Sequence, residues 1–234
     1  ALSDPPVLAV DDLHWIRHEG VLAALQAVLE HWPAGWHGVL IARVDPPLAL
    51  ARLRAAGRLM DIRAADLRCT EEETARYLRD TEALPLPEED IRRLAQRTEG
   101  WIAGLQMAVR TMRGSGDAVG FVREFAASPR VALDYLLEEV LQREPTETQA
   151  FLVETSILER LCSSLCDALT GEQNGQDMLE YIEHNNLFII PLDDERQWYR
   201  YHHLFAELLH QQLNQSHPKE DALLHQKASQ WYEE

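Results

Sequence analysis

The sequence has few long apolar runs, few cysteines and few lysines. No apolar run approaches the about 20 residues that a transmembrane helix requires. The chain opens with ALSDPP rather than with the basic segment of a secretory signal. Cys69, Cys162 and Cys166 are an odd and sparse set, which argues against a disulfide framework and favours a reducing compartment. We therefore expect a cytoplasmic protein that makes no contact with a membrane.

Lysine is almost absent, since Lys219 and Lys227 are the only two, and neither follows a glycine. A phosphate-binding P-loop has the pattern G-x-x-x-x-G-K-[ST], in which backbone N–H groups and the lysine hold the phosphates. The sequence contains no such loop. On its own, the chain should bind nucleotide weakly or not at all.

Basic residues are outnumbered, 22 against 39 acidic residues, which gives a formal net charge of −17. The imbalance is concentrated in residues 129–214, which hold 16 acidic and 5 basic side chains, whereas residues 1–128 hold 19 and 15. An acidic surface repels the phosphates of nucleic acid. The second half of the chain is therefore a poor candidate for reading DNA.

A short hydrophobic segment followed by two acids stands near the start of the chain. Val7–Val10 is a continuous apolar run, typical of a strand in a parallel sheet buried on both faces, and Asp11 and Asp12 follow at once. Ligands bind at the carboxyl edge of such sheets, and an acid at the end of a strand holds Mg²⁺ in Walker B motifs. The simpler alternative is a buried strand followed by an ordinary turn, because Asp is common in turns.

The residues after this segment predict a strand–helix–strand unit in a domain that spans residues 1–69. Val21–Trp32 has helical spacing of apolar residues, and Val39–Ala42 is a second short apolar run. Residues 48–58 predict a short helix. Residues 59–67 alternate in part and predict an edge strand that returns to the sheet.

Residues 70–128 predict a small helical lid. Thr70 and Glu73 form a capping box that begins the first helix. Further helices are expected from Pro87 to Gly100, where glycine marks the end, and from Trp101 onward. Residues 114–117, Gly-Ser-Gly-Asp, are the best linker signal in the chain.

Residues 129–214 predict a winged-helix domain, which is a set of helices followed by a β-hairpin. A short helix at 121–127 precedes it, and residues 215–234 predict the start of a helical arm. The hairpin strands are Leu187–Leu192 and Gln197–Tyr201, and a closing helix spans Leu204–Asn214. The other expected helices are 132–142, 146–155, 158–169 and 176–184.

The charges of this winged helix argue against a DNA-reading role. A reading helix presents Arg, Lys, Asn or Gln to the bases, with cations on the phosphates. The candidate helix instead carries Asp177, Glu180 and Glu183, and the hairpin tip is Asp-Asp-Glu at 193–195. An internal regulatory clamp is the better interpretation.

Other candidate constellations have simpler explanations. Cys162-x₃-Cys166 has helical spacing but no second Cys/His pair for zinc, so small core residues are expected there. His14 and His18 are four residues apart, and we expect both to be solvated. We expect Trp101 to lie in the core.

Five segments in one order carry a resemblance to a known family: VLAVDDLHWI, VLIARVDPPLALARLR, ADLRCTEEETARYL, TEGWIAGLQMA and WYRYHHLFAELL. Together they resemble the MalT-like branch of the LuxR-type transcriptional activators, which are signal-transduction ATPases with numerous domains. The resemblance implies a mixed α/β and α fold: part of a P-loop parallel sheet, then a helical lid, then the winged helix. It also implies a slow switch ATPase in which ADP keeps the protein closed, while ATP and an inducer permit self-assembly.

The resemblance also assigns roles to individual residues. Asp11 corresponds to the acid that binds Mg²⁺, and Asp12 to the acid that orients the attacking water. Arg43 corresponds to the sensor arginine that faces the γ-phosphate, a role that suits a planar guanidinium. The alternative for Arg43 is an arginine at a strand end paired with a surface acid. His202 corresponds to the histidine that contacts the β-phosphate of ADP, although His203 could take that place.

These roles imply that the cofactors, ATP or ADP with Mg²⁺, bind in a longer parent protein. Its partners for this chain would be an upstream P-loop, a downstream sensor arm and a separate DNA-binding domain. The chain alone should be inactive as an enzyme and should not bind DNA directly. The competing hypothesis is a helical interaction scaffold without a nucleotide role, in which Asp11, Asp12 and His202 are ordinary surface or junction residues.

Overall fold

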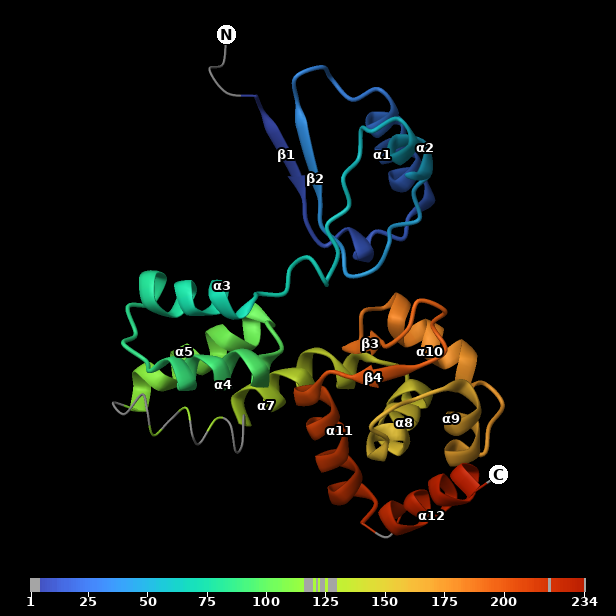
Figure 1. Ribbon diagram of the computed structural model, residues 1–234. Coiled ribbons are helices and arrows are strands. Elements are labelled where there is room, and N and C mark those ends of the chain that lie inside the picture. Colours follow the sequence, from blue (N-terminus) through green and yellow to red (C-terminus); the bar gives the residue numbers. More distant parts are fainter. Residues whose placement is uncertain are drawn as a thin grey trace. The chain divides into compact units, whose positions relative to one another are not determined.

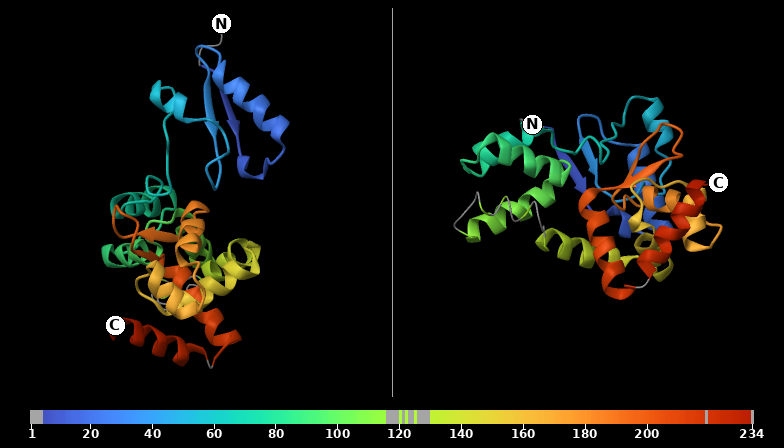
Figure 2. Two further views of the ribbon diagram at one scale, coloured as in Figure 1. Left: turned by 90° about the vertical axis from the view of Figure 1, so that its right-hand side faces the viewer. Right: turned by 60° about the horizontal axis from the view of Figure 1, so that its bottom comes forward.

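The computed structural model describes residues 5–115, 120, 122, 125, 130–218 and 220–233. The chain divides into two compact units (Figures 1 and 2): Ala1–Arg63 with His184–Asn186, and Ala64–Glu183 with Leu187–Glu234. The first holds a parallel strand pair and the second is mostly helical with a β-hairpin. The predicted mixed α/β and α fold is confirmed. None of the helices in the described part of the chain combines the length and apolar character needed to cross a bilayer.

The first unit is built around two parallel strands. β1 (Val7–Val10) pairs in parallel with β2 (His37–Leu40). Between them the chain forms the 3₁₀ turn η1 (Leu13–Trp15) and helix α1 (Glu19–Glu30), and α2 (Ala51–Ala55) follows β2. This is the predicted strand–helix–strand order, with the second strand displaced by two residues.

The strands of this unit are more exposed than predicted. Val7 is 63% exposed, Leu8 43% and Val39 45%, so the expectation of strands buried on both faces is wrong for this structure. The reason is that only β1 and β2 pair within the described part of this unit. A small cluster of buried side chains lies instead around α1 and α2, Leu29, Leu50 and Leu53, and Leu13 of η1 is also fully buried.

Residues 59–67 do not form the predicted edge strand. Leu59 packs against the leucines of the small core, but Met60 is 79% and Ile62 59% exposed, so the alternation does not form one covered face. The intervening Asp61 accepts hydrogen bonds from Arg54 Nε at 2.8 Å and from Arg63 at 3.2 Å. Ion pairs rather than strand pairing therefore organise this segment.

The second unit begins with the helices of the segment predicted as a lid, residues 70–128, which is called the lid below. Thr70 starts it as predicted: its hydroxyl accepts the Glu73 N–H at 3.2 Å, and its own N–H donates to the Glu73 carboxylate at 2.9 Å. The capping box is confirmed. The elements of the lid are α3 (Glu71–Arg76), the π-helical turn η2 (Tyr77–Thr81), α4 (Glu88–Thr98) and α5 (Ile102–Ser115).

The end of α5 corrects the linker prediction. Gly114 and Ser115 continue the helix, whereas residues 116 and 117 lie outside the described residues. Of the helix expected at 121–127, Val122 and Phe125 are described, and both are helical and buried. The other residues of that prediction lie outside the described part.

The winged helix follows, with the hairpin strands β3 (Ile189–Pro191) and β4 (Tyr199–Tyr201) paired antiparallel. Its helices before the hairpin are α7 (Arg130–Glu139), α8 (Thr146–Glu154), α9 (Ser163–Thr170) and α10 (Gly175–His184), with 3₁₀ turns η3 (Leu141–Arg143) and η4 (Thr155–Ile157). After it come α11 (His203–Ser216) and α12 (Glu220–Glu233).

Residues 158–162 are not helical, which corrects the predicted helix at 158–169. Leu161 pairs with Tyr199: the Leu161 N–H donates to the Tyr199 carbonyl at 2.8 Å, and the Tyr199 N–H donates back at 2.9 Å. This isolated antiparallel bridge places Leu161 beside strand β4 of the hairpin. Helix α9 therefore begins only at Ser163.

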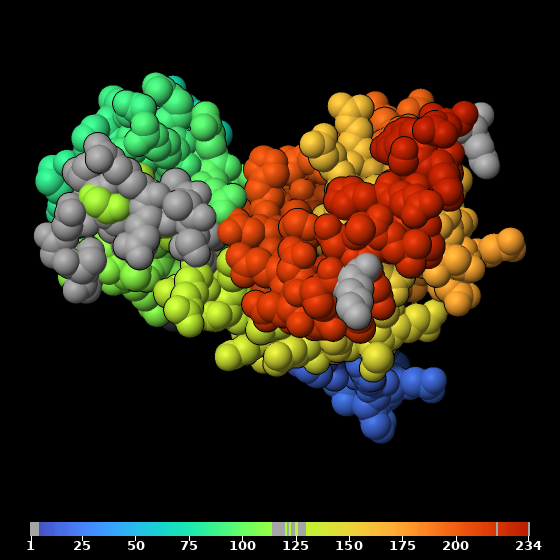
Figure 3. All heavy atoms as spheres, turned by 90° about the horizontal axis from the view of Figure 1, so that it is seen from below, coloured from blue at the N-terminus to red at the C-terminus, as the bar shows by residue number. Residues whose placement is uncertain are grey.

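One continuous apolar core runs through the lid and the winged helix. Fully buried leucines come from both parts, among them Leu94 of α4, Leu136 of α7, Leu165 of α9 and Leu208 of α11. Cys162 and Cys166 are buried in the same core, in agreement with their predicted role. Helices α11 and α12, drawn in orange-red and red, lie over the winged-helix part of the face seen from below (Figure 3).

Candidate functional site

The carboxyl ends of β1 and β2 bring three of the predicted site residues to one edge. Asp11 and Asp12 follow β1 directly, and Arg43 lies three residues beyond the end of β2. The strands are parallel and in register from Val7↔His37 onward. The Leu13 N–H donates to the Ile41 carbonyl at 3.0 Å, so the two strand ends stay joined beyond the sheet.

The two acids form a tight turn at this edge. Asp12 has a left-handed backbone with φ 54°, which aspartate tolerates better than most residues, and its N–H donates to Asp11 Oδ1 at 2.8 Å. The Asp12 side chain is 71% exposed. Two exposed carboxylates at the end of a parallel strand have the oxygen ligands that Mg²⁺ uses together with phosphate and water.

His14 belongs to this edge, which the sequence did not predict. Its side chain is only 14% exposed, so the expectation of a solvated ring is wrong. Nδ1 lies 3.9 Å from Asp12 Oδ1 and accepts the Arg43 N–H at 3.5 Å. The ring therefore bridges the segments that follow β1 and β2. His18 is different, because its ring caps α1 by accepting the Gly20 N–H at 3.1 Å.

His202 lies in the second unit, where it is buried and caps α11. Its Nδ1 accepts the Leu204 N–H at 3.3 Å, so Nε2 carries the ring proton and donates to the Thr98 carbonyl at 2.9 Å. Burial lowers the pKa of His202, although the negative charge of Glu99 opposes this shift. In this structure both ring nitrogens are thus bonded to protein groups and the ring is neutral at pH 7.

His203, the alternative, has a side chain that is 62% exposed. Its backbone N–H donates to Glu99 Oε1 at 2.8 Å, and its ring Nδ1 lies 3.2 Å from the same oxygen. The first turn of α11 therefore directs an N–H and an imidazole toward one carboxylate.

Glu99 is the second residue that sequence reasoning missed. It follows α4 with φ 46°, and its side chain is 9% exposed. Arg200 donates to it twice, from Nη1 to Oε1 at 2.9 Å and from Nη2 to Oε2 at 2.7 Å. Burial raises the pKa of this carboxyl, but Arg200 and the N–H of His203 outweigh it and lower the pKa to about 2.

The Trp101 ring packs beside this group. Its centroid lies 5.1 Å from that of Phe188 in an edge-to-face arrangement and 6.3 Å from the His202 ring. Trp101 is half-buried against the core of the second unit, as predicted.

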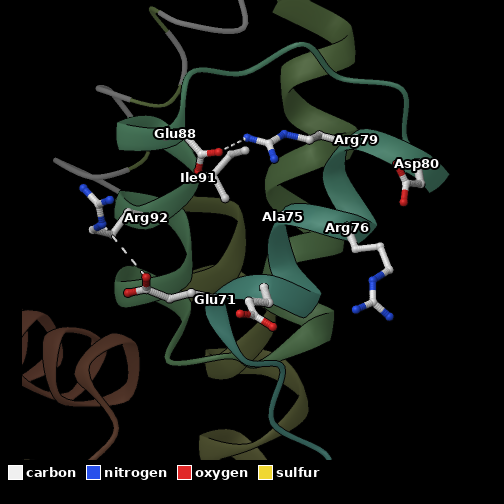
Figure 4. A pocket seen from close by; sticks show the side chains of 9 residues that line it. Glu71, Ala75, Arg76, Arg79, Asp80, Glu88, Ile91 and Arg92 are labelled. Atoms are coloured by element: carbon white, nitrogen blue, oxygen red, sulfur yellow. Dashed lines mark hydrogen bonds and ion pairs between the residues drawn. The ribbon is translucent and has the colours of Figure 1, made fainter.

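A cavity of about 410 Å³ lies on the lid, between α3, η2 and α4 (Figure 4). Its lining carries charges of both signs, and some of them form ion pairs. Arg79 pairs with Glu88 at 2.6 Å, and Arg92 lies 3.9 Å from Glu71. Two of its three arginines, Arg79 and Arg92, therefore each lie beside an acidic side chain. Within the described ranges, no group of three or more His, Cys, Asp or Glu side chains could hold a metal ion.

Comparison with known proteins shows which proteins this chain resembles. Residues 137–221 match the family model described as the MalT winged helix domain. This part of the chain is therefore similar to the winged helix domain of MalT. The match begins in α7 and extends into the start of α12, so it includes the hairpin, the His202 cap and Arg200.

Longer relatives match nearly the whole chain. A serine/threonine-protein kinase PknK of Mycobacterium tuberculosis is 34% identical over 232 residues, 99% of this chain and 21% of that protein. HTH-type transcriptional regulators MalT are 34% identical over 90% of the chain in Serratia proteamaculans and 32% over 97% in Yersinia enterocolitica. The chain spans about a fifth to a quarter of the length of these relatives. The resemblance to MalT-like proteins is confirmed.

A solved structure supports the fold. The Walker-type ATPase Paby2304 of Pyrococcus abyssi superposes with a TM-score of 0.59 over 87% of this chain and 62% of its own length, at 18% identity. At that identity the likeness concerns the fold alone. It agrees with the mixed α/β and α fold described above.

Proposed function

We propose that this chain is the central regulatory segment of a cytoplasmic, MalT-like transcriptional regulator that exchanges ADP for ATP. The observation that carries the proposal is the convergence of Asp11, Asp12 and Arg43 at the carboxyl edge of the β1–β2 pair. Exposed carboxylates at that edge, with an arginine in the segment that follows the neighbouring strand, suit a magnesium nucleotide. In this proposal Asp11 binds Mg²⁺, Asp12 orients the attacking water and Arg43 faces the γ-phosphate.

The exposed strands support a partner that supplies the phosphate-binding loop. Val7, Leu8 and Val39 leave apolar surface open on a two-stranded sheet, and a sheet of this kind is stable only when its faces are covered. In the longer protein we assign this cover to an upstream P-loop half of the same domain. ATP or ADP with Mg²⁺ would then bind between that loop and the Asp11 edge, and turnover would be slow.

The role proposed for His202 requires a rearrangement. A ring N–H can reach the β-phosphate of ADP only after Nε2 gives up the Thr98 carbonyl, which it contacts at 2.9 Å. His203 needs no such change, since its ring is exposed. We assign the nucleotide contact to His202 because its ring also bonds Thr98 at the end of α4. A phosphate bound by this ring would therefore affect the contact between lid and winged helix.

The winged helix is proposed as an internal clamp rather than a DNA reader. Acidic side chains of α10 and the hairpin serve the domain itself: Glu183 pairs with Arg196 at 2.7 Å, and the Asp193 carboxylate accepts the N–H groups of Gln197 and Trp198. Promoter binding and self-assembly would belong to other parts of the longer regulator.

The test uses the longer protein that includes a glycine-rich phosphate loop. Wild type is expected to retain ADP through purification, whereas Asp11→Asn and His202→Ala should bind it roughly tenfold or more weakly, as for the loss of one charged hydrogen bond. His202→Asn separates the two functions of the ring, because asparagine can still cap α11 but cannot place a donor where Nε2 lies. Asp80→Asn, which changes an exposed acid of the lid, is the matched control.

Equal ADP binding by wild type, Asp11→Asn and His202→Ala would reject the nucleotide roles of these residues. The interaction-scaffold function would then take their place. The 234-residue chain alone is expected to bind no magnesium ADP in calorimetry, because it has no P-loop.

A further inference from the structure

Thr98–Trp101 forms a joint between the lid and the winged helix. These four residues connect α4 to α5, and three of them also contact the corner where β4 leads into α11. We propose that Glu99 is a latch whose carboxylate holds this corner on the lid, and whose release lets the corner separate from α4 and α5. The inference goes beyond the nucleotide proposal, because every contact in it lies within the second unit and can be tested without nucleotide.

The carboxylate of Glu99 is the centre of the joint. It receives two hydrogen bonds from Arg200 of β4, at 2.9 and 2.7 Å, and one from the N–H of His203 at 2.8 Å. Nη1 of Arg68, which precedes the lid, lies 3.5 Å from Oε2 of Glu99. A negative charge beside the first turn of a 14-residue helix is also favoured by the helix dipole.

The residues on either side of Glu99 make further contacts at the joint. The Thr98 carbonyl accepts the His202 ring N–H, and the Trp101 ring packs edge-on against Phe188. Gly100 has φ 73°, and its carbonyl accepts the Cys69 N–H at 2.9 Å. Directly before Thr98, Arg97 of α4 forms an ion pair with Glu207 of α11.

The chemistry of this contact suits release better than permanent attachment. Desolvation offsets much of the attraction within a buried ion pair, so apolar side chains would hold the same surfaces as well or better. Removing one partner, in contrast, leaves the other charge unpaired at a large cost. Arg200 is 29% and Arg68 37% exposed, so water can replace the carboxylate once the corner separates. Such a contact is held as a unit or lost as a unit.

Hydrogen exchange of the 234-residue chain tests the latch, with Glu99→Gln as the first variant. The amides of Tyr199–Tyr201 and of His203 and Leu204 are expected to exchange roughly a hundredfold faster, on the scale of a broken buried ion pair. The amides of α9 and α10 should keep their wild-type rates. Glu89→Gln is the matched control, because it breaks an exposed pair with Arg93 within the same helix α4 and should change nothing at the corner.

The double variant Glu99→Leu/Arg200→Met keeps the test decisive if Glu99→Gln unfolds. Its corner is expected to stay protected and to respond less than the wild-type corner to salt between about 0.1 and about 1 M NaCl, over which the screening length falls from about 10 to about 3 Å. Wild-type corner amides should exchange faster over the same range. Unchanged corner exchange in Glu99→Gln, equal acceleration in α9, or the same salt response in wild type and the double variant would each overturn the latch.

Discussion

The two units bury their apolar side chains to very different extents. In the second unit, the lid and winged helix share one core to which nearly every helix contributes fully buried residues. In the first unit, three leucines form the small core, and the strands that carry the candidate site expose Val7, Leu8 and Val39. The winged-helix unit thus has its own core, whereas the strands bearing the Asp11 edge are only partly covered, by contacts such as that of Leu40 with the leucines of the small core.

This difference separates two kinds of polar group. In the first unit the acids of the candidate site are exposed at an edge, where a ligand can reach them. In the second unit the polar groups of the joint, Glu99 and His202, are buried and satisfied by protein donors and acceptors. The first arrangement suits binding, and the second suits transmission of a change through contacts that already exist.

The largest effect is expected from a core substitution that contrasts the two units. Leu165→Ala in α9, at a fully buried position, should lower the free energy of unfolding by about 2–5 kcal/mol through lost burial and a cavity. Val39→Ala in the exposed β2 should lower it by about 1 kcal/mol or less. Urea denaturation measures both, and equal losses would contradict the difference in burial.

A second contrast concerns two glycines with positive φ. Gly100 has φ 73°, and a Cβ there would meet the Cys69 carbonyl oxygen at 2.3 Å, so Gly100→Ala should destabilise the second unit by about 1–3 kcal/mol. Gly35 has φ 80° but open space around it, so Gly35→Ala should cost only the strained backbone, about 1 kcal/mol. Thermal unfolding compares them, and a milder effect at Gly100 would show that the Cys69 contact yields easily.

The parts of the site that the sequence predicted depend on local order. Asp11, Asp12 and Arg43 could be placed together because parallel strands bring their carboxyl ends to one edge, whatever surrounds them. The hairpin and the capping box followed from turn and cap residues. The ADP contact at His202 and the boundaries of the four predicted domains stay predictions.

The role of Glu99 could not be predicted from the sequence, because its partner Arg200 lies 101 residues further along the chain. One signal was available: an acid at the carboxyl end of a helix opposes the helix dipole, so Glu99 required a compensating group. His14 was missed for a similar reason, since its contact with Arg43 joins segments 29 residues apart. The exposure of β1 could not be foreseen, because an apolar run does not reveal how many strands cover it.

The buried carboxylate makes a prediction about pH. The pKa of Glu99 is about 2 in the folded chain against 4.5 as the ordinary value, so its contribution to stability is complete above pH 4.5. That contribution falls as the pH drops toward 2, where the folded carboxyl protonates. The difference in unfolding midpoint between wild type and Glu99→Gln should therefore be constant from pH 7 to about 5 and shrink below that. Arg200, Arg68, His202 and His203 are the charged or titratable groups that face Glu99. A difference that grows on acidification would contradict the assigned pairing.

The smallest effect is expected at the ion pairs of the first unit. Asp61 accepts hydrogen bonds from Arg54 and Arg63, which lower the pKa of its carboxyl despite an opposing effect of desolvation, yet the side chains involved are one-third to one-half exposed. Water and salt screen such pairs, so Asp61→Asn should leave the urea midpoint unchanged within error. The midpoint of Glu99→Gln should shift clearly under the same conditions, because the carboxylate that it replaces is buried and shielded from solvent. If Asp61→Asn destabilised the chain as much as Glu99→Gln, the residues around 59–63 would be held by these charges, and the first unit would depend on its ion pairs as strongly as the joint does.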